Sequence, residues 1–346
     1  MKRLLPVTPI LLLLALLLSP GAALAGAKQG LSLWWGSVFP SLLPSFICLK
    51  LAQKLGLLRL AGHHPRGRLA AVMGFSLLSG APNGARLLNA LVEDGSLSCR
   101  NGSRLLPLVN SVSPAFLLSI IASELLKNKA LFLPMAVSFY GCAILLSFPI
   151  FLQCAGSDHA HDPTPLPSVP FADALAAAME ESMLDMLRIG GCILFSCTLL
   201  FVIRQAVPGP SASAALAISM EISTGASAIA TLDLPLRLRV SLLVGAAAFG
   251  GLSLGLQTLC CFPKLKLVPY LVKKLLYGAL VGLVCYLIFP LFPSVAAAFA
   301  SRQEVLSRSL SLSALLLSSV LSAAFIGVLS LMIGPKNRNS QKYSCN

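Results

Sequence analysis

Charged residues are scarce in this sequence. Asp, Glu, Lys and Arg together make up 11% of its 346 residues, whereas hydrophobic residues make up 56%. A water-soluble domain of this length needs more polar side chains than that to cover its surface. The mean hydropathy of +0.85 points the same way. The shortage of charge therefore excludes a water-soluble domain and predicts an integral membrane protein.

Acidic residues are the rarer kind: 12 Asp and Glu stand against 26 Lys and Arg, which gives a formal net charge of +14. In a soluble protein such an excess would suggest a nucleic-acid partner. Here the basic residues lie mostly in short links between apolar runs, where the preference of Lys and Arg for the cytoplasmic side of a membrane explains them. We therefore expect membrane lipid as a partner and no nucleic acid.

Catalytic and metal-binding motifs are missing. The sequence contains no H-E-x-x-H, no G-x-S-x-G and no P-loop, and no histidine lies near a candidate nucleophile. Its ten cysteines form no C-x-x-C pair, and most fall in or beside apolar runs, as is typical of small buried hydrophobes. The four histidines lie in two polar segments, His63-His64 and DHAHD (158–162). We therefore expect no enzyme activity, no metal and no cofactor.

Long apolar runs are what the sequence has in abundance. A spanning helix needs about 20 mainly apolar residues, and the runs that meet this requirement are 4–25, 31–57, 104–126, 130–153, 186–206, 238–260, 272–293 and 309–334. Two further stretches, 70–92 and 213–232, are interrupted near their midpoints by Gly, Ser, Thr or Pro. Each half is too short to cross the bilayer, and the interruption frees backbone groups that lipid cannot satisfy. The sequence therefore predicts an all-α polytopic membrane protein with about eight transmembrane helices and two re-entrant helical hairpins.

The distribution of Lys and Arg predicts the orientation of these spans. With this arrangement, 17 of the 26 basic residues fall on one side of the membrane and 8 on the other, and Arg86 lies within the first hairpin. The positive-inside rule then places both termini in the cytosol. The first run also fits a secretory signal peptide, because a basic start and a leucine-rich core precede an A-x-A pattern at Ala23 to Ala25. Cleavage there would leave seven spans with the same loop orientation.

The order of the parts repeats along the chain, since two long units each consist of a span, an interrupted hairpin and two further spans. Three spans, an odd number, separate the starts of the two units. The units therefore have opposite orientations, as in the inverted repeats of secondary transporters. The predicted divisions are 1–30, 31–153, 154–185, 186–293 and 294–346.

The linker between the two units ends in an amphipathic segment. In FADALAAAMEESMLDML (171–187), a line of Phe, Leu and Met side chains from Phe171 to Met183 occupies one helical face, and Asp173 and Glu180 occupy the opposite face. Such a pattern is typical of a helix that lies in the membrane interface. We interpret its acidic residues as a solvated face.

Polar residues at membrane depth form the candidate binding site, and they fall in the two interrupted stretches and in the span that follows each of them. The candidate substrate-binding residues are Ser79, Gly80, Pro82, Asn83, Gly84, Arg86, Asn110, Ser113, Glu221, Ser223, Thr224, Gly225, Ser253 and Gln257. Each has a structural alternative, because glycine lets helices approach closely and Ser or Thr in a membrane helix bonds its own backbone. Charges cost more at the bilayer centre. For Arg86 and Glu221 we therefore favour a functional role over a structural ion pair between the two.

The segment SGAPNGAR (79–86) also predicts what is bound. A helix interrupted by a turn rich in Gly, Pro and Asn presents unpaired N–H groups and a dipole end that favour negative charge. Arg86 adds a full positive charge beside that turn. The site is therefore predicted to bind an anion, such as a carboxylate, that lipid would exclude.

Six motifs resemble, in order, those of the YlbJ-type sporulation integral membrane proteins. They are WWGSVFPSLLPSF (34–46), SGAPNGARLL (79–88), RLLPLVNSVSPAF (104–116), RIGGCILFSC (188–197), MEISTGA (220–226) and FGGLSLGLQ (249–257). Those proteins belong to a wider group with nucleoside-recognition Gate domains, which are similar in architecture to concentrative nucleoside transporters. The resemblance extends from about residue 31 to residue 293 and implies that the two predicted units are Gate-like repeats.

The resemblance further implies a role in endospore formation. Members of the family are implicated in passing dipicolinic acid, made in the mother cell, across the outer forespore membrane, which is therefore the expected location. Dipicolinate is a dianion with two carboxylates on a pyridine ring, and it matches a site with Arg86 at a hairpin tip. Glu221 is a candidate carrier of a coupling proton or cation.

Two other functions are compatible with the same residues. A nucleoside transporter would need ribose-binding carboxylates or amides in both hairpins, and Glu221 and Asn83 supply one of each. A structural membrane protein that recruits partners during spore assembly would have no need of polar residues within its interrupted segments. The leading prediction is therefore a transporter of a small organic anion.

Overall fold

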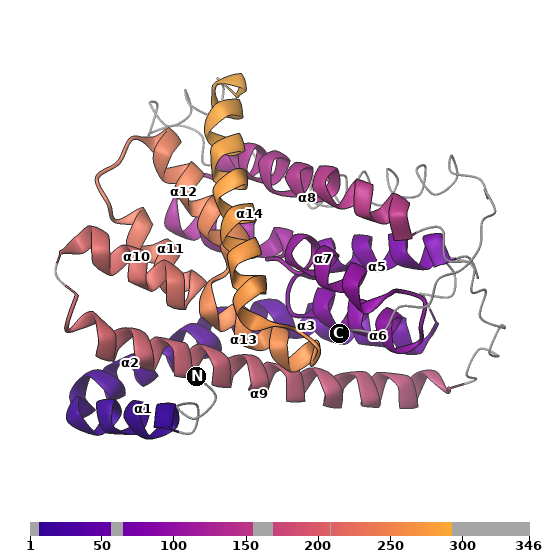
Figure 1. Cartoon of the computed structure of the whole chain (residues 1–346), viewed down its shortest axis with the longest axis horizontal. Helices are drawn as coiled ribbons and strands as arrows, with labels where there is room; N and C mark the ends of the chain where they lie inside the picture. Colours follow the sequence, from indigo (N-terminus) through magenta and orange to yellow (C-terminus); the bar gives the residue numbers. More distant parts are fainter. Residues whose placement is uncertain (1–6, 57–64, 155–168, 208, 293–346) are drawn as a thin grey trace.

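The computed structural model describes residues 7–56, 65–154, 169–207 and 209–292 (Figure 1). Within those ranges the chain is helical and has no β-strand, which confirms the all-α prediction. The helices long and apolar enough to cross a membrane are Pro20–Lys54, Lys129–Gln153, Phe171–Arg204, Leu236–Cys261 and Leu267–Leu291. These five candidate spans support a polytopic helical membrane protein. The predicted run 309–334 and both histidine segments lie outside the described residues.

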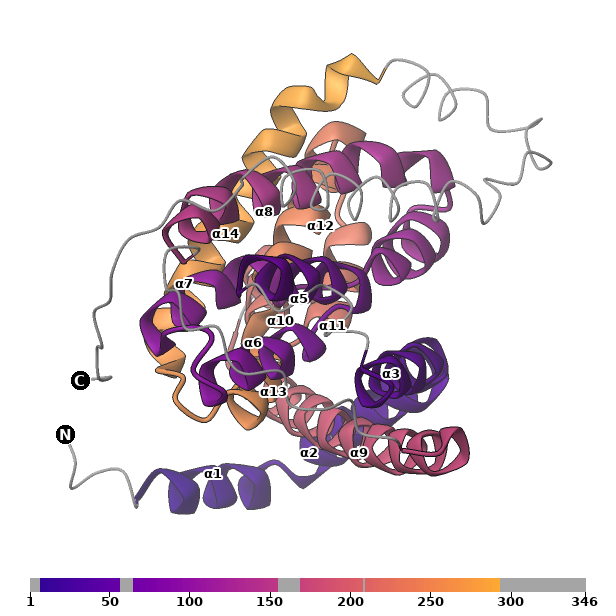
Figure 2. The ribbon, with the colours of Figure 1, turned by 90° about the vertical axis from the view of Figure 1, so that its right-hand side faces the viewer.

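The first helices lie on one side of the molecule (Figure 2). The first predicted run is divided between α1 (Val7–Leu18) and α2 (Pro20–Leu33), because proline lacks the N–H that would continue a helix and fits best at a helix start. Helix α2 continues through a π-helical turn, η1 (Trp34–Val38), into α3 (Phe39–Lys54). Glycine lets α2 approach α9 closely, since a Cβ on Gly30 would lie 2.9 Å from the Cα atom of Leu194.

Helix α9 (Phe171–Arg204) is a single helix of 34 residues. At a rise of 1.5 Å per residue it is about 50 Å long, which exceeds the roughly 30 Å hydrocarbon thickness of a bilayer. The predicted interfacial segment and the span after it therefore form one continuous helix. Its buried face carries small side chains, Ala174, Ala178 and Ser182, whereas Met183 of the predicted apolar face is exposed.

The first interrupted stretch forms a helical hairpin of two helices that pack against each other. Its arms are α5 (Pro65–Ser79) and α6 (Asn83–Glu93). The next predicted span is also broken, because α7 (Cys99–Val109) ends before Asn110 and the chain resumes as a π-helix, η2 (Phe116–Leu125). After it come η3 (Lys129–Leu131) and α8 (Phe132–Cys154). The structure therefore has no single helix over 104–126.

The second interrupted stretch is a hairpin as well, with arms α10 (Pro210–Met220) and α11 (Ile222–Ala230) that also pack together. The span predicted after it is divided into α12 (Leu236–Phe249) and α13 (Gly251–Cys261). Gly250 and Gly251 form this joint with φ angles of 83° and 71°, a left-handed conformation that only glycine adopts readily. The chain then forms α14 (Leu267–Ile288) and η4 (Phe289–Leu291).

The helices pack in layers, with the hairpins between two outer groups (Figure 2). The main hydrophobic core joins α5, α6, α7 and α8 to α11, α12 and α14, and includes Leu88, Phe139 and Val244. A smaller core holds α3 against α9 through Phe46, Ile189 and neighbouring residues. The hairpins are therefore held by the first core, and α9 closes one side of the molecule.

Helices α12 and α14 touch through their backbones. A Cβ on Gly278 would lie 2.6 Å from the carbonyl oxygen of Gly245, and a Cβ on Gly282 would lie 3.0 Å from that of Ser241. Small residues at such a contact are typical of membrane helices, whose association depends on close van der Waals packing. This contact joins the middle of the second unit to its last helix.

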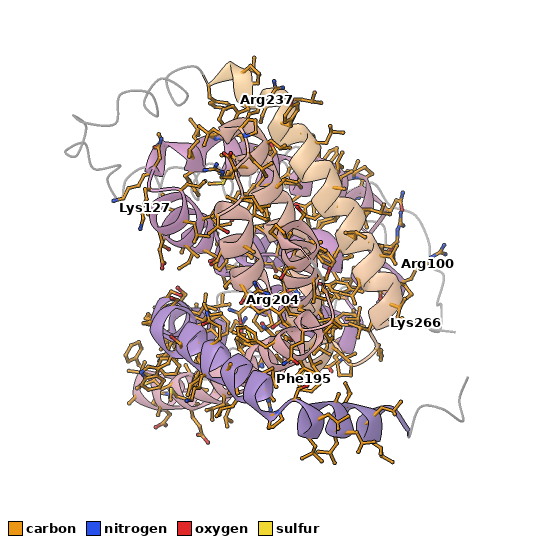
Figure 3. All side chains as sticks on the ribbon, turned by 90° about the vertical axis from the view of Figure 1, so that its left-hand side faces the viewer. Arg100, Lys127, Phe195, Arg204, Arg237 and Lys266 are labelled. Atoms are coloured by element: carbon orange, nitrogen blue, oxygen red, sulfur yellow. The ribbon has the colours of Figure 1, made fainter. Side chains whose placement is uncertain are left out.

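The basic residues lie both at the periphery and inside the molecule. Figure 3 shows Arg100 and Lys266 together at one edge, away from Lys127 and Arg237. Which edge faces the cytosol stays a prediction. Two of the 17 residues assigned to the cytosolic side, Lys50 and Lys274, are buried within helices at 4% and 0% exposure. They are therefore internal charges, and the positive-inside count does not explain them.

Candidate functional site at the first hairpin

The tip of the first hairpin is a tight turn at residues 80–82. Gly80 has a φ of 76°, and a Cβ there would lie 2.7 Å from the backbone nitrogen of Ser113. Only glycine combines this conformation with so close an approach. Pro82 occupies the N-cap position of α6 and gives that helix no side-chain cap. The sequence thus turns sharply and restarts a helix whose first residue is Asn83.

This tip docks on the break between α7 and η2. The backbone N–H of Ala81 donates to the carbonyl of Ser111 over 2.6 Å, and that of Ala85 donates to Oδ1 of Asn110 over 3.1 Å. The other end of the Asn110 amide donates to Thr258 Oγ1 over 2.8 Å. Asn110 therefore ties the hairpin to α13, and its side-chain amide is fully engaged within the protein.

A cavity of roughly 300 Å³ lies beside the tip and is walled by α3, α6, α9 and α13. Asn83, Arg86, Asn89 and Glu93 of α6 line it, and their spacing places them along one face of the helix. Across the cavity lie residues of α3, α9 and α13, among them Lys50, Glu181, Arg188, Cys260 and Cys261. The hairpin therefore supplies one polar wall of an otherwise mixed site.

Asp185 of α9 is the centre of an ion-pair network behind this cavity. Its carboxylate is 2% exposed and pairs with Arg86, with Lys50 Nζ at 2.5 Å, and with Arg188 at 3.4 Å. Glu181 pairs with Lys50 and Lys54. Four cations thus share two carboxylates in this network, which leaves two positive charges in excess. The Glu93 carboxylate on the cavity wall offsets one of these charges, and the remaining positive charge favours an anionic ligand.

Asn83 has unpaired polar atoms in this wall. Its side chain is 1% exposed, and neither its amide nitrogen nor its amide oxygen has a hydrogen-bond partner. The Arg86 Nε atom is likewise buried and unpaired. A buried polar group without a partner costs about 1 to 3 kcal/mol, and most such groups in native proteins are satisfied. These atoms are therefore the donors and acceptor that a ligand in the cavity would bind.

The second hairpin satisfies its own tip. Glu221, 2% exposed, is the N-cap of α11, and its carboxylate accepts from the N–H groups of Ser223 over 3.0 Å and Thr224 over 2.7 Å. A Cβ on Gly225 would lie 2.6 Å from the Cα of Ile218, so the two arms touch. Among the described residues the ion-pair partner of Arg86 is Asp185 and not Glu221.

The other predicted site residues are engaged locally. Ser79 Oγ donates to the carbonyl of Phe75, and Ser113 Oγ accepts from the N–H of Phe116. Gln257 donates to Ser253 over 3.3 Å on the buried face of α13. Of the predicted residues, only Asn83 and Arg86 line the cavity.

The sequence interpretation missed two important residues of the site, Lys50 and Asp185. Lys50 was assigned to a basic link, and Asp185 falls in the amphipathic segment whose charges were interpreted as solvated. One signal for Asp185 was present, since Ala174, Ala178, Ser182 and Asp185 recur on one helical face and a small-residue face is typical of close helix packing. Lys50 also had a signal, because it lies between two leucines inside the predicted run 31–57, and a charge within an apolar run usually has a partner.

Comparison with known proteins gives one relative. The chain is 31% identical over 207 residues to the sporulation integral membrane protein YlbJ of Bacillus subtilis, an alignment that covers 51% of each chain. The chain thus spans about half the length of the curated relative it matches. No family model matches the sequence, and no solved structure matches it. The protein is therefore a membrane protein related to a sporulation integral membrane protein.

Proposed function

We propose that this protein is a membrane transporter of a small organic anion, which binds in the cavity beside the first hairpin. The observation that carries the proposal is the unpaired Asn83 amide next to Arg86, in a cavity backed by an excess of positive charge. A scaffold protein has no use for an unsatisfied amide in such a place, whereas a ligand site needs free donors and acceptors. A small cavity with few convergent polar groups is typical of ligand sites.

The proposed substrate is dipicolinate, and three properties of the site support it. The ion-pair network and the Glu93 carboxylate on the cavity wall together leave one surplus positive charge, which favours an anion. The guanidinium of Arg86 can bind a carboxylate with two N–H groups. The Asn83 amide offers both a donor and an acceptor to the second carboxylate or to the ring nitrogen. In the bound state we expect Arg86 to exchange Asp185 for a substrate carboxylate.

The architecture suits alternating access. In each unit a hairpin rests on the break of the helix that follows it. In the first unit the Ala81 N–H donates to the carbonyl of Ser111. In the second unit a Cβ on Gly251 would lie 2.9 Å from the carbonyl oxygen of Ile218. We infer that the two units are inverted repeats, in which broken helices meet at the substrate site. Movement of a hairpin on its break would then open the cavity to one side or the other.

The proposed location is the outer forespore membrane, with both termini in the cytosol. The sporulation role rests on the related YlbJ protein and on the six motifs of the sequence. The orientation rests on the excess of Lys and Arg in links of one side. Dipicolinate made in the mother cell would cross that membrane on its way into the forespore.

A binding measurement tests the proposal directly. The purified full-length chain in detergent is titrated by calorimetry with pyridine-2,6-dicarboxylate, pyridine-2-carboxylate and uridine. We expect the dicarboxylate to bind at least about tenfold more tightly than the monocarboxylate, because the second carboxylate gains a charge-assisted contact of about 1.5 to 3 kcal/mol. Tighter binding of uridine would assign the cavity to nucleosides. Binding of none of the three would favour a role in recruiting partners.

A further inference from the structure

An apolar groove of roughly 580 Å³ lies between the second hairpin and the two packed helices α12 and α14. Residues of the hairpin arms α10 and α11 form one wall, among them Ala215 and Ile229. Residues of α12 and α14 form the other, among them Leu242 and Leu283. The lining is apolar apart from two serines and Tyr286. The groove is therefore distinct from the polar cavity at the first hairpin, and its chemistry fits a hydrocarbon chain.

The groove has the length of one membrane leaflet. Along α14 its lining residues run from Leu275 to Tyr286, which corresponds to about 16 Å at the rise of an α-helix. The hydrocarbon core of a bilayer is about 30 Å thick, so each leaflet contributes about 15 Å. Because α14 spans Leu267–Ile288, the groove follows the half of this candidate span that ends beside Tyr286. An acyl chain of one leaflet therefore fits along it, with the polar head of the lipid at the Tyr286 end.

A fixed arginine lies at that end of the groove. The Arg237 guanidinium lies over the Tyr286 ring, 3.8 Å from its centroid, and its Nε donates to the Tyr286 carbonyl over 2.7 Å. Figure 3 shows Arg237 at the edge of the molecule, beside the end of α14. A guanidinium carries N–H donors on each of its nitrogens, so these two contacts fix its position and leave its terminal amino groups for a ligand. The planar arrangement of those donors matches a phosphate group.

The charge at this end of the groove is positive. Arg237 and Arg239 both lie near the start of α12, and within the described residues neither forms an ion pair. Arg239 donates to the carbonyl of Leu234 over 2.9 Å. Asp233, exposed in the link before α12, is the acidic residue closest to them in the sequence and offsets one of the two charges. The remaining positive charge beside an apolar groove complements a ligand with an anionic head and a hydrocarbon chain.

We propose that the groove binds one anionic phospholipid. An acyl chain fills the space between α10 and the α12–α14 pair, and the phosphate accepts hydrogen bonds from the terminal amino groups of Arg237. A zwitterionic phospholipid has a phosphate as well, but its own cationic group offsets the attraction, so the site selects anionic lipid. The bound lipid joins an arm of the second hairpin to the two packed helices. This inference does not depend on the substrate of the first hairpin.

Photo-crosslinking in lipid nanodiscs identifies the occupant. The full-length chain carries p-benzoylphenylalanine in place of Leu283, which lines the groove, or of Leu276, which is exposed on α14 outside it. The nanodiscs hold equal amounts of phosphatidylglycerol and phosphatidylcholine with identical acyl chains, and mass spectrometry identifies the adducts. In the groove we expect phosphatidylglycerol adducts to exceed phosphatidylcholine adducts about fivefold, the factor that one arginine contributes to the binding of an anionic lipid. Outside the groove the two adducts should form equally.

A substitution at the head end tests the role of the charge. Arg237→Gln should reduce the ratio of the two adducts in the groove to the ratio found outside it. Arg204→Gln, at an exposed position that does not line the groove, is the matched control and should leave the ratio at about fivefold. An unchanged ratio in Arg237→Gln would overturn the assignment of the lipid head to this residue.

A substitution in the wall tests the role of the groove. Ala215→Leu places a larger side chain in the groove and should lower the yield of lipid adducts there, with Arg237 intact. Ala212→Leu, at an exposed position of the same helix outside the groove, should leave the yield as in the wild type. Equal yields in the two variants would show that the lipid chain does not occupy the groove.

Thermal unfolding in a neutral detergent distinguishes a lipid from a free anion. Because a ligand that binds only the folded state raises its stability, phosphatidylglycerol should raise the Tm of the wild type and have a smaller effect on Arg237→Gln. Glycerol phosphate, which has the phosphate without the acyl chains, should leave the Tm of the wild type unchanged. An equal rise with glycerol phosphate would reveal an anion site that needs no groove and would overturn the lipid proposal.

The crosslinked products also test the other possible occupants of the groove. An adduct between position 283 and a peptide from 309–334 of the same chain would show that the chain itself covers the groove. An adduct of twice the protein mass would assign the groove to a second copy. Either product in place of the lipid adducts would overturn the proposal, as would equal amounts of the two lipids at position 283.

Discussion

The two hairpins have the same construction and opposite chemistry. Each has two short helices joined at a tight tip that rests on the break of the next helix. At the second tip, the carboxylate of Glu221 fills the N-terminus of α11. At the first tip, Pro82 offers no side-chain cap to α6, and Asn83 and Arg86 follow with unpaired atoms.

This difference shows which hairpin is built for a ligand. A carboxylate at a helix N-terminus satisfies both the free N–H groups and the dipole, so the second tip carries its own anion. The first tip lacks one, and the cavity beside it is lined by three cations, Lys50, Arg86 and Arg188, against two carboxylates, Glu93 and Glu181. The anion that the first hairpin lacks is the one we expect the substrate to supply. Substitutions at the two tips should therefore separate binding from stability.

The largest effect should come from Asp185→Ala, which removes the carboxylate that holds Arg86, Lys50 and Arg188 together. Removal of one partner from a buried ion pair costs about 3 to 5 kcal/mol, because the remaining charge stays buried. We expect a loss of that size in the free energy of unfolding, measured by denaturant titration in detergent. Asp173→Ala, at an exposed position of the same helix, is the control and should change little. Equal losses of unfolding free energy in Asp185→Ala and Asp173→Ala would show that the ion pairs of Asp185 do not stabilise the fold.

Arg86→Lys should impair binding despite keeping the charge. A guanidinium makes two parallel bonds to one carboxylate, a geometry that a single ammonium cannot reproduce. Loss of one desolvated contact of this kind is worth about 2 to 5 kcal/mol, and calorimetry with pyridine-2,6-dicarboxylate measures it. Arg104→Lys is the matched control, because Arg104 is exposed on α7 and is not among the residues that line the cavity. Unchanged affinity in Arg86→Lys would remove Arg86 from the binding site.

Asn83→Ala and Glu221→Gln should act in opposite ways. Asn83→Ala removes a buried amide without partners, so the free protein should become more stable by about 1 kcal/mol while affinity for the dicarboxylate falls. Glu221→Gln weakens an N-cap, so stability should fall by about 1 kcal/mol while affinity is unchanged. Thermal unfolding and calorimetry of both variants check this reversal. A loss of stability in both variants would mean that Asn83, like Glu221, stabilises the free protein and is not kept for a ligand.

The smallest effect concerns the far end of the first hairpin, where Arg68 of α5 pairs with Asp94 just after α6. Partial burial raises the pKa of the Asp94 carboxyl, but hydrogen bonds from Ser96 and Arg68 outweigh it and hold the pKa below its usual value. A depressed pKa stabilises the folded state above about pH 4 and ceases to do so as the pH falls through the folded value. We expect Asp94→Asn to lower stability by about 0.5 kcal/mol at neutral pH.

Unfolding curves from about pH 7 down to about pH 3 check this small effect. The stability difference between Asp94→Asn and the wild type should shrink steadily as the pH falls. If the stability difference is the same at high and at low pH, the ion pair does not stabilise the contact between the two arms of the hairpin. This result concerns only the end of the hairpin away from its tip, and it does not test the proposed binding site.

The sequence predicted both hairpin breaks because each has a local chemical cause. Gly80 and Pro82 cannot continue a helix, and a polar residue such as Glu221 at membrane depth indicates a helix end. The breaks at 110–115 and 250–251 were missed, although Pro114 and two adjacent glycines marked them. Averaging hydrophobicity over a whole span hides such short signals.

The charged residues of the site were harder to place. Lys274 follows Lys273, and Lys50 lies a few positions before Gln53 and Lys54, so both were assigned to the cytosolic side. Their burial comes from partners more than 100 positions away, Asp185 for Lys50 and Ser111 for Lys274. A single sequence carries no record of such pairings. Arg86 was predicted because it follows directly on the turn that interrupts an apolar stretch.

The glycine contact between α12 and α14 limits how the second unit can move. The two backbones touch at Gly245 and Gly278. The helices therefore cannot rotate or slide past each other without a clash, and they move as one rigid pair. Lys274 lies on α14 one turn before this contact, and its ammonium donates hydrogen bonds to the break between α7 and η2 in the first unit. Movement of this pair against the first unit would therefore strain the Lys274 bonds, and movement against α13 would bend the glycine joint at 250–251.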